Sequence, residues 1–302
     1  GIVYLVTMYL GLGTAFVIGL TKVGGFGGLQ SALVAQGAPV NLYNPFSASF
    51  NAALALLVGG VLGGMAAQAS IQPVFAAKDV RTARRASMLA GLIVAPFGIM
   101  TAFFGLFAKT GMFIADTATI NPKMVLPTLL QTPGFIPPVL GGLALAGVLA
   151  AILSTVGPVN FAVVTIAAKD IYHGLINRNA DDAKIISTAR RLVVLVSLVT
   201  VPLAIFLRGA VLDTAYISYA IRAIGAIVIM TALYARKLVT ELGVKLAFII
   251  GTVAVFVTMY ARQAGWFEID KTYGAVIATL VVILLSTIGD RLFGGRARAR
   301  RG

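Results

Sequence analysis

The sequence predicts an all-α protein embedded in a membrane, and three observations carry this prediction. Of the 302 residues, 59% are hydrophobic and only 11% are charged, and the mean hydropathy is +0.96. Such values exclude a water-soluble domain of this length. Apolar runs of about 20 residues, the length that crosses the hydrocarbon core of a bilayer, recur along the whole chain. We therefore predict one transmembrane domain over residues 1–302.

Eight such runs are predicted to be membrane-spanning helices: 1–20, 48–75, 84–108, 138–168, 188–208, 213–235, 243–261 and 272–290. The connections 21–47 and 109–137 are rich in Gly, Pro and Asn, and we expect them to be loops and candidate lids. The glycines at 24–28 follow no strand, so a turn is favoured over a nucleotide-binding loop. Within the second run, Gly59, Gly60, Gly63 and Gly64 form two overlapping GxxxG pairs, which predict close helix packing in lipid.

The distribution of positive charge predicts the orientation in the membrane. The net charge is +14, and Lys and Arg gather in the second, fourth and sixth connections and in the tail 291–302. Cytoplasmic loops carry such an excess, so both ends of the chain are predicted to be cytoplasmic. This spread also argues against a nucleic-acid partner, which needs one basic face. The basic tail is expected to anchor the topology or to contact anionic lipid.

The start of the chain and its cysteine count bear on processing and redox chemistry. Gly1 opens directly into an apolar run without a charged flank or a signal peptide. We expect the chain to be the C-terminal part of a longer protein. The sequence contains no cysteine, which excludes disulfides and thiolate metal sites.

The run 149–172 is an apolar stretch of membrane-spanning length whose middle carries small and hydroxyl-bearing residues. Ala151, Ser154 and Thr155 lie at i, i+3 and i+4, so they share one helix face. Pro158 lacks the N–H that would bond the Ser154 carbonyl, and we predict a helix break there. Hydroxyl groups in hydrocarbon need partners. A small cation, backbone carbonyls one turn back and a neighbouring helix all remain open as partners.

Several motifs, taken together with their order and spacing along the chain, resemble those of the sodium/solute symporter family. The resemblance covers essentially the whole chain. The motifs are LAAILST followed by KDIY, Gln68-xxx-Gln72 before the segment 75–92, the glycines at 24–25, and P-x-x-L…GLALAG at 127–146. The resemblance implies a partial LeuT-type inverted-repeat fold of five plus five helices. This chain would then hold the last helix of the first repeat, the whole second repeat and two peripheral helices. It would lack the first core helices.

The same resemblance implies a plasma-membrane symporter that works by alternating access with Na⁺. The implied sodium ligands are the Ala151 carbonyl and the Ser154 and Thr155 hydroxyls, completed by carbonyls of the absent first core helix. Oxygen donors of this kind suit a hard cation. Gly157 and Pro158 stand where some family members carry further serines for a second ion. One Na⁺ is therefore predicted.

The expected solute is a small amino acid or carboxylate. Sugar-transporting members carry a Tyr-Trp pair, a Lys and a Gln where this chain has 63–64, 92–94 and 215–218, so a sugar is disfavoured. Arg222 is the one charge deep in a predicted span and must face a cavity or a partner. An acid outside this chain, backbone carbonyls and a carboxylate solute are all open as that partner. Gln68, Gln72 and Tyr219 are further candidates for the solute path.

Three other functional classes were compared with the sequence by the residues that each would need: a membrane enzyme, a proton-coupled transporter and a membrane sensor. A membrane enzyme is disfavoured, because one histidine and scattered acids supply neither a metal site nor an acid–base pair. A proton-coupled transporter would need an intramembrane acid or histidine; none lies at depth in these spans, and this alternative stays open only through an acid outside this chain. A symporter-like sensor domain is the third alternative. The expected partners are a small organic solute and membrane lipid, and the oligomeric state is left open.

Overall fold

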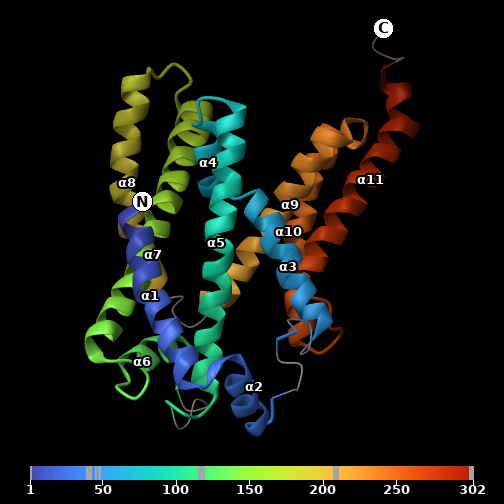
Figure 1. Cartoon of the computed structure of the whole chain (residues 1–302). Coiled ribbons are helices and arrows are strands. Elements are labelled where there is room, and N and C mark those ends of the chain that lie inside the picture. Colours follow the sequence, from blue (N-terminus) through green and yellow to red (C-terminus); the bar gives the residue numbers. More distant parts are fainter. Residues whose placement is uncertain are drawn as a thin grey trace. The chain divides into compact units, whose positions relative to one another are not determined.

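The computed structural model describes residues 2–38, 43–44, 46, 49–114, 120–206 and 211–298, and within these ranges every regular element is helical (Figure 1). The chain divides into two compact units. Unit 1 comprises residues 1–47 and 73–196, and unit 2 comprises residues 48–72 and 197–302. The candidate sodium ligands lie in unit 1, and Arg222 and Tyr219 lie in unit 2.

The predicted spans are confirmed as helices in the described part of the chain. Seven helices are long and apolar enough to cross a membrane, whereas the predicted span 48–75 is divided into α3 and α4, which meet the same test only as a pair bent by 42°. Residues 1, 48, 207 and 208 of the predicted spans lie outside the described residues. These helices are α1 (Ile2–Lys22), α3 (Phe50–Met65), α4 (Gln68–Phe75), α5 (Val80–Lys109), α7 (Pro138–Thr165), α8 (Asp182–Phe206), α9 (Val211–Tyr234), α10 (Glu241–Gln263) and α11 (Lys271–Arg298).

The two long connections are not simply loops, and this corrects the sequence prediction. The first contains α2 (Gly25–Ala35), and the second contains a 3₁₀ turn (Pro122–Met124) and α6 (Val125–Gln131). Gly24 and Gly25 have φ of 82° and 74°, a left-handed conformation that lets the chain turn sharply after α1 and begin a new helix. These short helices are held by burial, because Leu29 of α2 and Leu129 of α6 are fully buried.

Unit 1 is organised around the packing of α1 against α7. A Cβ added at Gly11 of α1 would lie 2.4 Å from the Leu143 carbonyl oxygen, and one at Gly147 of α7 would lie 3.1 Å from the Thr7 carbonyl oxygen. Only glycine permits this backbone approach. At the α1–α2 end, the rings of Phe107 and Phe135 are fully buried and pack with centroids 5.9 Å apart.

Unit 2 is held together by small residues at its helix crossings. A Cβ at Gly63 of α3 would lie 3.0 Å from the Tyr219 Cα of α9, and one at Gly59 would lie 3.3 Å from the Thr272 side chain of α11. The packing prediction is thus confirmed for Gly59 and Gly63, whereas Gly60 and Gly64 face open space. Helices α10 and α11 lie side by side (Figure 1), and Gly274 approaches Thr258 there.

The winding of α7 changes later than the sequence predicts. The α-helix continues through Pro158 to Thr165, and a π-helix follows over Ile166–Ile176. The expected break at Pro158 is therefore absent. The α-helical winding continues on both sides of the proline. Helix α11 continues into the basic tail as far as Arg298, and residues 299–302 lie outside the described part.

Candidate sodium and solute sites

The three predicted sodium ligands meet within one turn of α7. The Ser154 hydroxyl donates a hydrogen bond of 2.8 Å to the Ala151 carbonyl oxygen, and the Thr155 hydroxyl donates one of 3.0 Å to the same oxygen. Ala151 and Ser154 are half-buried, and Thr155 is exposed. The three oxygens thus converge, and back-bonding to a carbonyl, one of the alternatives weighed from the sequence, is also present.

Back-bonding and cation binding are chemically compatible for the two hydroxyls of this turn, whereas the Ala151 carbonyl must be released by at least one hydroxyl before it can bind a cation. A hydroxyl that donates its proton to a carbonyl keeps its lone pairs, so its oxygen still offers them to a cation. Neutral hydroxyl and carbonyl oxygens suit a hard cation such as Na⁺. The described residues contain no group of three His, Cys, Asp or Glu side chains that would hold a metal ion. Ala151, Ser154 and Thr155 would supply three oxygens, and the remaining ligands would have to come from elsewhere.

The position of these oxygens along α7 follows from its packing. The buried residues of the first half of α7 are Gly141, Ala144, Gly147 and Ala150, which form one stripe of small side chains. From residue 151 to residue 161, no residue of α7 is buried. The oxygens therefore begin where the packed stripe ends. Within the described structure, the helix face that carries these oxygens is not fully covered by the rest of the chain, so a partner can reach it.

In unit 2, Arg222 stacks on an aromatic side chain. Its Cζ lies 4.8 Å from the centroid of the Tyr219 ring, and its Nε donates to the Ser218 carbonyl oxygen at 3.2 Å. Arg222 is half-buried, and it forms no ion pair among the side chains that the structure describes. A backbone carbonyl, one of the partners left open by the sequence, is therefore one of its contacts.

The contact network continues from Tyr219 to a lysine that the sequence did not single out. The Tyr216 and Tyr219 rings are 6.3 Å apart, and the Lys271 Nζ lies 5.7 Å from the centroid of the Tyr216 ring. Lys271 begins α11, far along the sequence from α9. No spacing in the sequence signals a contact between such distant positions. A pocket of about 40 Å³ lies here, lined in part by Tyr216, Tyr219, Lys271 and Gly59.

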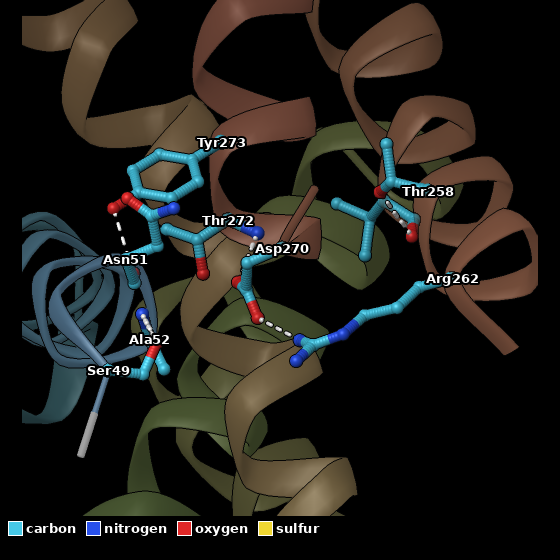
Figure 2. Close-up of polar contacts among 9 residues, drawn as sticks. Ser49, Asn51, Ala52, Thr258, Arg262, Asp270, Thr272 and Tyr273 are labelled. Carbon is cyan, nitrogen blue, oxygen red and sulfur yellow. Dashed lines mark hydrogen bonds and ion pairs between the residues drawn. The ribbon is translucent and has the colours of Figure 1, made fainter. Parts of the chain in front are cut away.

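A second polar cluster fastens the start of α11, and sequence reasoning missed it. Figure 2 shows Asp270 between the Arg262 guanidinium, at 3.2 Å, and the Thr272 backbone N–H, at 2.8 Å. The Tyr273 hydroxyl donates to the Asn51 carbonyl oxygen at 3.0 Å, which ties α11 to α3. The signal available in the sequence was Asp270 just before a span, where a carboxylate caps the first turn of a helix.

The two glutamines of the solute-path prediction lie on α4. Gln68 begins this helix, and Gln72 lies one turn later; both are half-buried. Neither side chain forms a hydrogen bond within the described part of the chain. Their place on the second arm of the bent α3–α4 pair is thus known, and their role on an exit path stays a prediction.

Fold and sequence together define a multi-pass α-helical membrane protein. A profile of the sodium:solute symporter family matches residues 2–251, and the chain belongs to this family. The chain is 25% identical to the osmoregulated proline transporter of Bacillus subtilis over 222 residues, covering 71% of this chain and 43% of that protein. It is also 25% identical to the sodium/proline symporter of Escherichia coli over 283 residues, covering 90% and 54%.

A third relative is the sodium/proline symporter of Salmonella typhimurium, 25% identical over 213 residues, covering 68% of this chain and 41% of that protein. The chain thus spans about half the length of the curated relatives it matches. The family and the names of these relatives confirm the predicted family and the prediction that the chain is not an enzyme.

Proposed function

We propose that the protein containing this chain is a Na⁺-coupled symporter of a small amino acid or carboxylate, with L-proline as the first solute to test. Family membership supports sodium coupling, and three relatives at about 25% identity are named as proline transporters or symporters. The proposed fold is the LeuT-type inverted repeat, which works by alternating access around a midplane site. The proposed location is the plasma membrane, with both ends of this chain cytoplasmic.

The observation that carries the proposal is the convergence of three neutral oxygens on α7. Ala151, Ser154 and Thr155 present a carbonyl and two hydroxyls within one turn, on a stretch where α7 is not buried. We assign them to one Na⁺, whose other ligands come from outside this chain. In this assignment each hydroxyl turns a lone pair to the ion, and at least one hydroxyl releases the Ala151 carbonyl, whose two lone pairs both accept hydrogen bonds in the present structure. The site then needs no carboxylate.

The test is Na⁺-dependent uptake of radiolabelled L-proline into proteoliposomes that contain the full-length protein. Ser154→Ala and Thr155→Ala should each raise the Na⁺ concentration for half-maximal uptake by about tenfold or more, because each removes one ligand oxygen. The matched control is Thr165→Ala, because Thr165 lies on the same helix and donates a similar back-bond, of 2.8 Å, to the Phe161 carbonyl. This control should leave the Na⁺ dependence unchanged.

Two results would contradict the assignment. Uptake that ignores Na⁺ and follows pH would replace sodium coupling with proton coupling. An equal change in all three variants would show that loss of any back-bonded hydroxyl perturbs α7, without a sodium site at residues 151–155.

A further inference from the structure

Four side chains of unit 2 form a continuous series of contacts that we call the cation–tyrosine ladder: Lys271, Tyr216, Tyr219 and Arg222. The successive separations are 5.7 Å from the Lys271 ammonium to the Tyr216 ring, 6.3 Å between the rings, and 4.8 Å from the Tyr219 ring to the Arg222 guanidinium. Tyr216, Tyr219 and Arg222 are three residues apart, so they share one face of α9. At 1.5 Å per residue, the Tyr216-to-Arg222 portion covers about 9 Å along the helix.

The cation at the first end of the ladder keeps its charge available for an anion. Asp270 is adjacent to Lys271 in the sequence, but its carboxylate accepts from the Arg262 guanidinium and from the Thr272 backbone N–H (Figure 2). Lys271 has no ion-pair partner among the described residues. A tyrosine ring attracts a cation through its quadrupole without carrying a neutralising charge. Half-buried Lys271 is therefore held in place and remains an anion-binding group.

The cation at the other end is arranged in the same way. Arg222 uses its Nε for the Ser218 carbonyl, while its terminal nitrogens form no hydrogen bond or ion pair within the described structure. These nitrogens are the pair that binds a carboxylate in a bidentate manner. Tyr219, on which the guanidinium rests, is fixed from behind, because its backbone packs directly on Gly63 of α3.

We propose that the cation–tyrosine ladder is the entry track for the carboxylate group of the transported solute. Lys271 receives the carboxylate at the end of α9 that the charge distribution predicts to be external. The faces of Tyr216 and Tyr219 then contact the apolar body of the solute, and Arg222 binds the carboxylate as the inner station. The inference rests on the proposed function, and it adds a solute class and a path. The two cations lie at opposite ends of the ladder with the two tyrosine rings between them, so one can release the carboxylate of a solute as the other takes it up.

The first experiment measures competition in the uptake assay with the full-length protein. L-proline and L-prolinamide share a ring, but only L-proline has a carboxylate. Arg222→Gln should reduce the advantage of L-proline over L-prolinamide as a competitor by about tenfold or more, the usual effect of losing a hydrogen bond to a charged group. Arg222→Lys should restore part of this selectivity, because it keeps the charge but loses the fork.

Loss of Lys271, the outer end of the track, should change the kinetics of uptake in a different way. Lys271→Gln should raise KM for L-proline about three- to tenfold with little change in kcat, and should weaken the dependence of KM on ionic strength. Lys109→Gln is the matched control: it removes an exposed cation from the last turn of α5, at the start of a connection predicted to lie on the same side. Equal effects of Lys271→Gln and Lys109→Gln would overturn the track, because they would reflect only overall charge.

A second measurement keeps this inference separate from the proposed function. Benzoate combines an aromatic ring with a carboxylate, and its binding to the purified full-length protein is observed by saturation-transfer NMR without transport. The ladder predicts a signal in the wild type that falls in Arg222→Gln and Lys271→Gln and persists in Lys109→Gln. Absence of the signal in the wild type, or an equal signal in all variants, overturns the ladder even if uptake is Na⁺-dependent. Absence of Na⁺-dependent uptake with the predicted NMR pattern overturns the proposed function alone.

Discussion

Replacing Gly63 by alanine should loosen the contact between α3 and α9 and displace Tyr219. The added Cβ would lie 3.0 Å from both the Cα and the carbonyl oxygen of Tyr219, and 3.1 Å from its Cβ. Ordinary carbon–carbon contact is about 3.5–4.0 Å, so the two helices must separate by roughly half an ångström or more. Two of the opposing atoms belong to the backbone, which cannot rotate away as a side chain does.

The size of the effect follows from overpacking of a close helix crossing. Inserting a methyl group into such a contact costs about 1–3 kcal/mol, which corresponds to a fall in Tm of roughly 2–10 °C for a domain of this size. Gly64→Ala is the matched control, because nothing lies within 4 Å of a Cβ at this position. The control gains helix propensity and should unfold at the wild-type temperature or slightly above it.

The assay is thermal unfolding of the full-length protein in one detergent, followed by loss of the monodisperse peak in size-exclusion chromatography. L-proline KM is measured on the same preparations, because displacement of Tyr219 should raise KM in Gly63→Ala and not in Gly64→Ala. Equal Tm values for the two variants would refute the close approach of α3 and α9 at Gly63.

Two further predictions concern capping and ion pairing outside the site. The Thr82 backbone N–H, followed by the Thr82 hydroxyl, lowers the pKa of the exposed Asp79 carboxyl at the start of α5. Its contribution to stability is present above the unfolded pKa and is lost as the pH falls through the folded pKa. Hydrogen exchange of the backbone amides in the first turn of α5, corrected for intrinsic rates, should therefore rise as the pH falls through the pKa of Asp79. The Asp79→Asn variant should lack this pH dependence. The same pH profile in the wild type and in Asp79→Asn would contradict the capping role of Asp79. Arg262→Gln should lower the Tm by a few degrees at most, because Arg262 is 52% exposed while its partner Asp270 is only 20% exposed. Lys245→Gln removes a pair that is 66% and 83% exposed and should not change the Tm measurably, so a larger effect there than at Arg262 would reverse the expected order.

The sequence predicted the spanning helices because membrane insertion depends on composition over about 20 residues, which can be read without knowing any contact. Helix α2 was missed for the opposite reason. Its glycine-rich start has the composition of a turn, and the helix is held by burial of Leu29 and Leu33 against the core of unit 1. Such burial is decided by distant residues and leaves little local signal.

The two candidate sites show the same contrast. Ser154 and Thr155 are three and four residues after Ala151, so helical geometry alone brings their oxygens together, as the structure shows. Lys271 contacts Tyr216 across 55 positions of sequence, and no spacing rule links them. The sequence therefore indicated one end of the cation–tyrosine ladder, Arg222 and Tyr219, and missed the contact of Lys271 at the other end.

The dependence of L-proline uptake on Na⁺ concentration, measured at fixed pH with the full-length protein in proteoliposomes, tests the central claim most directly. A single site at Ala151, Ser154 and Thr155 predicts that the initial rate rises with Na⁺ along a hyperbola with a Hill coefficient of about 1. The same curve for Ser154→Ala should shift to higher Na⁺ while that for Thr165→Ala stays in place. A rate that is independent of Na⁺, or a wild-type curve that Ser154→Ala leaves unmoved, would contradict the assignment of sodium to α7.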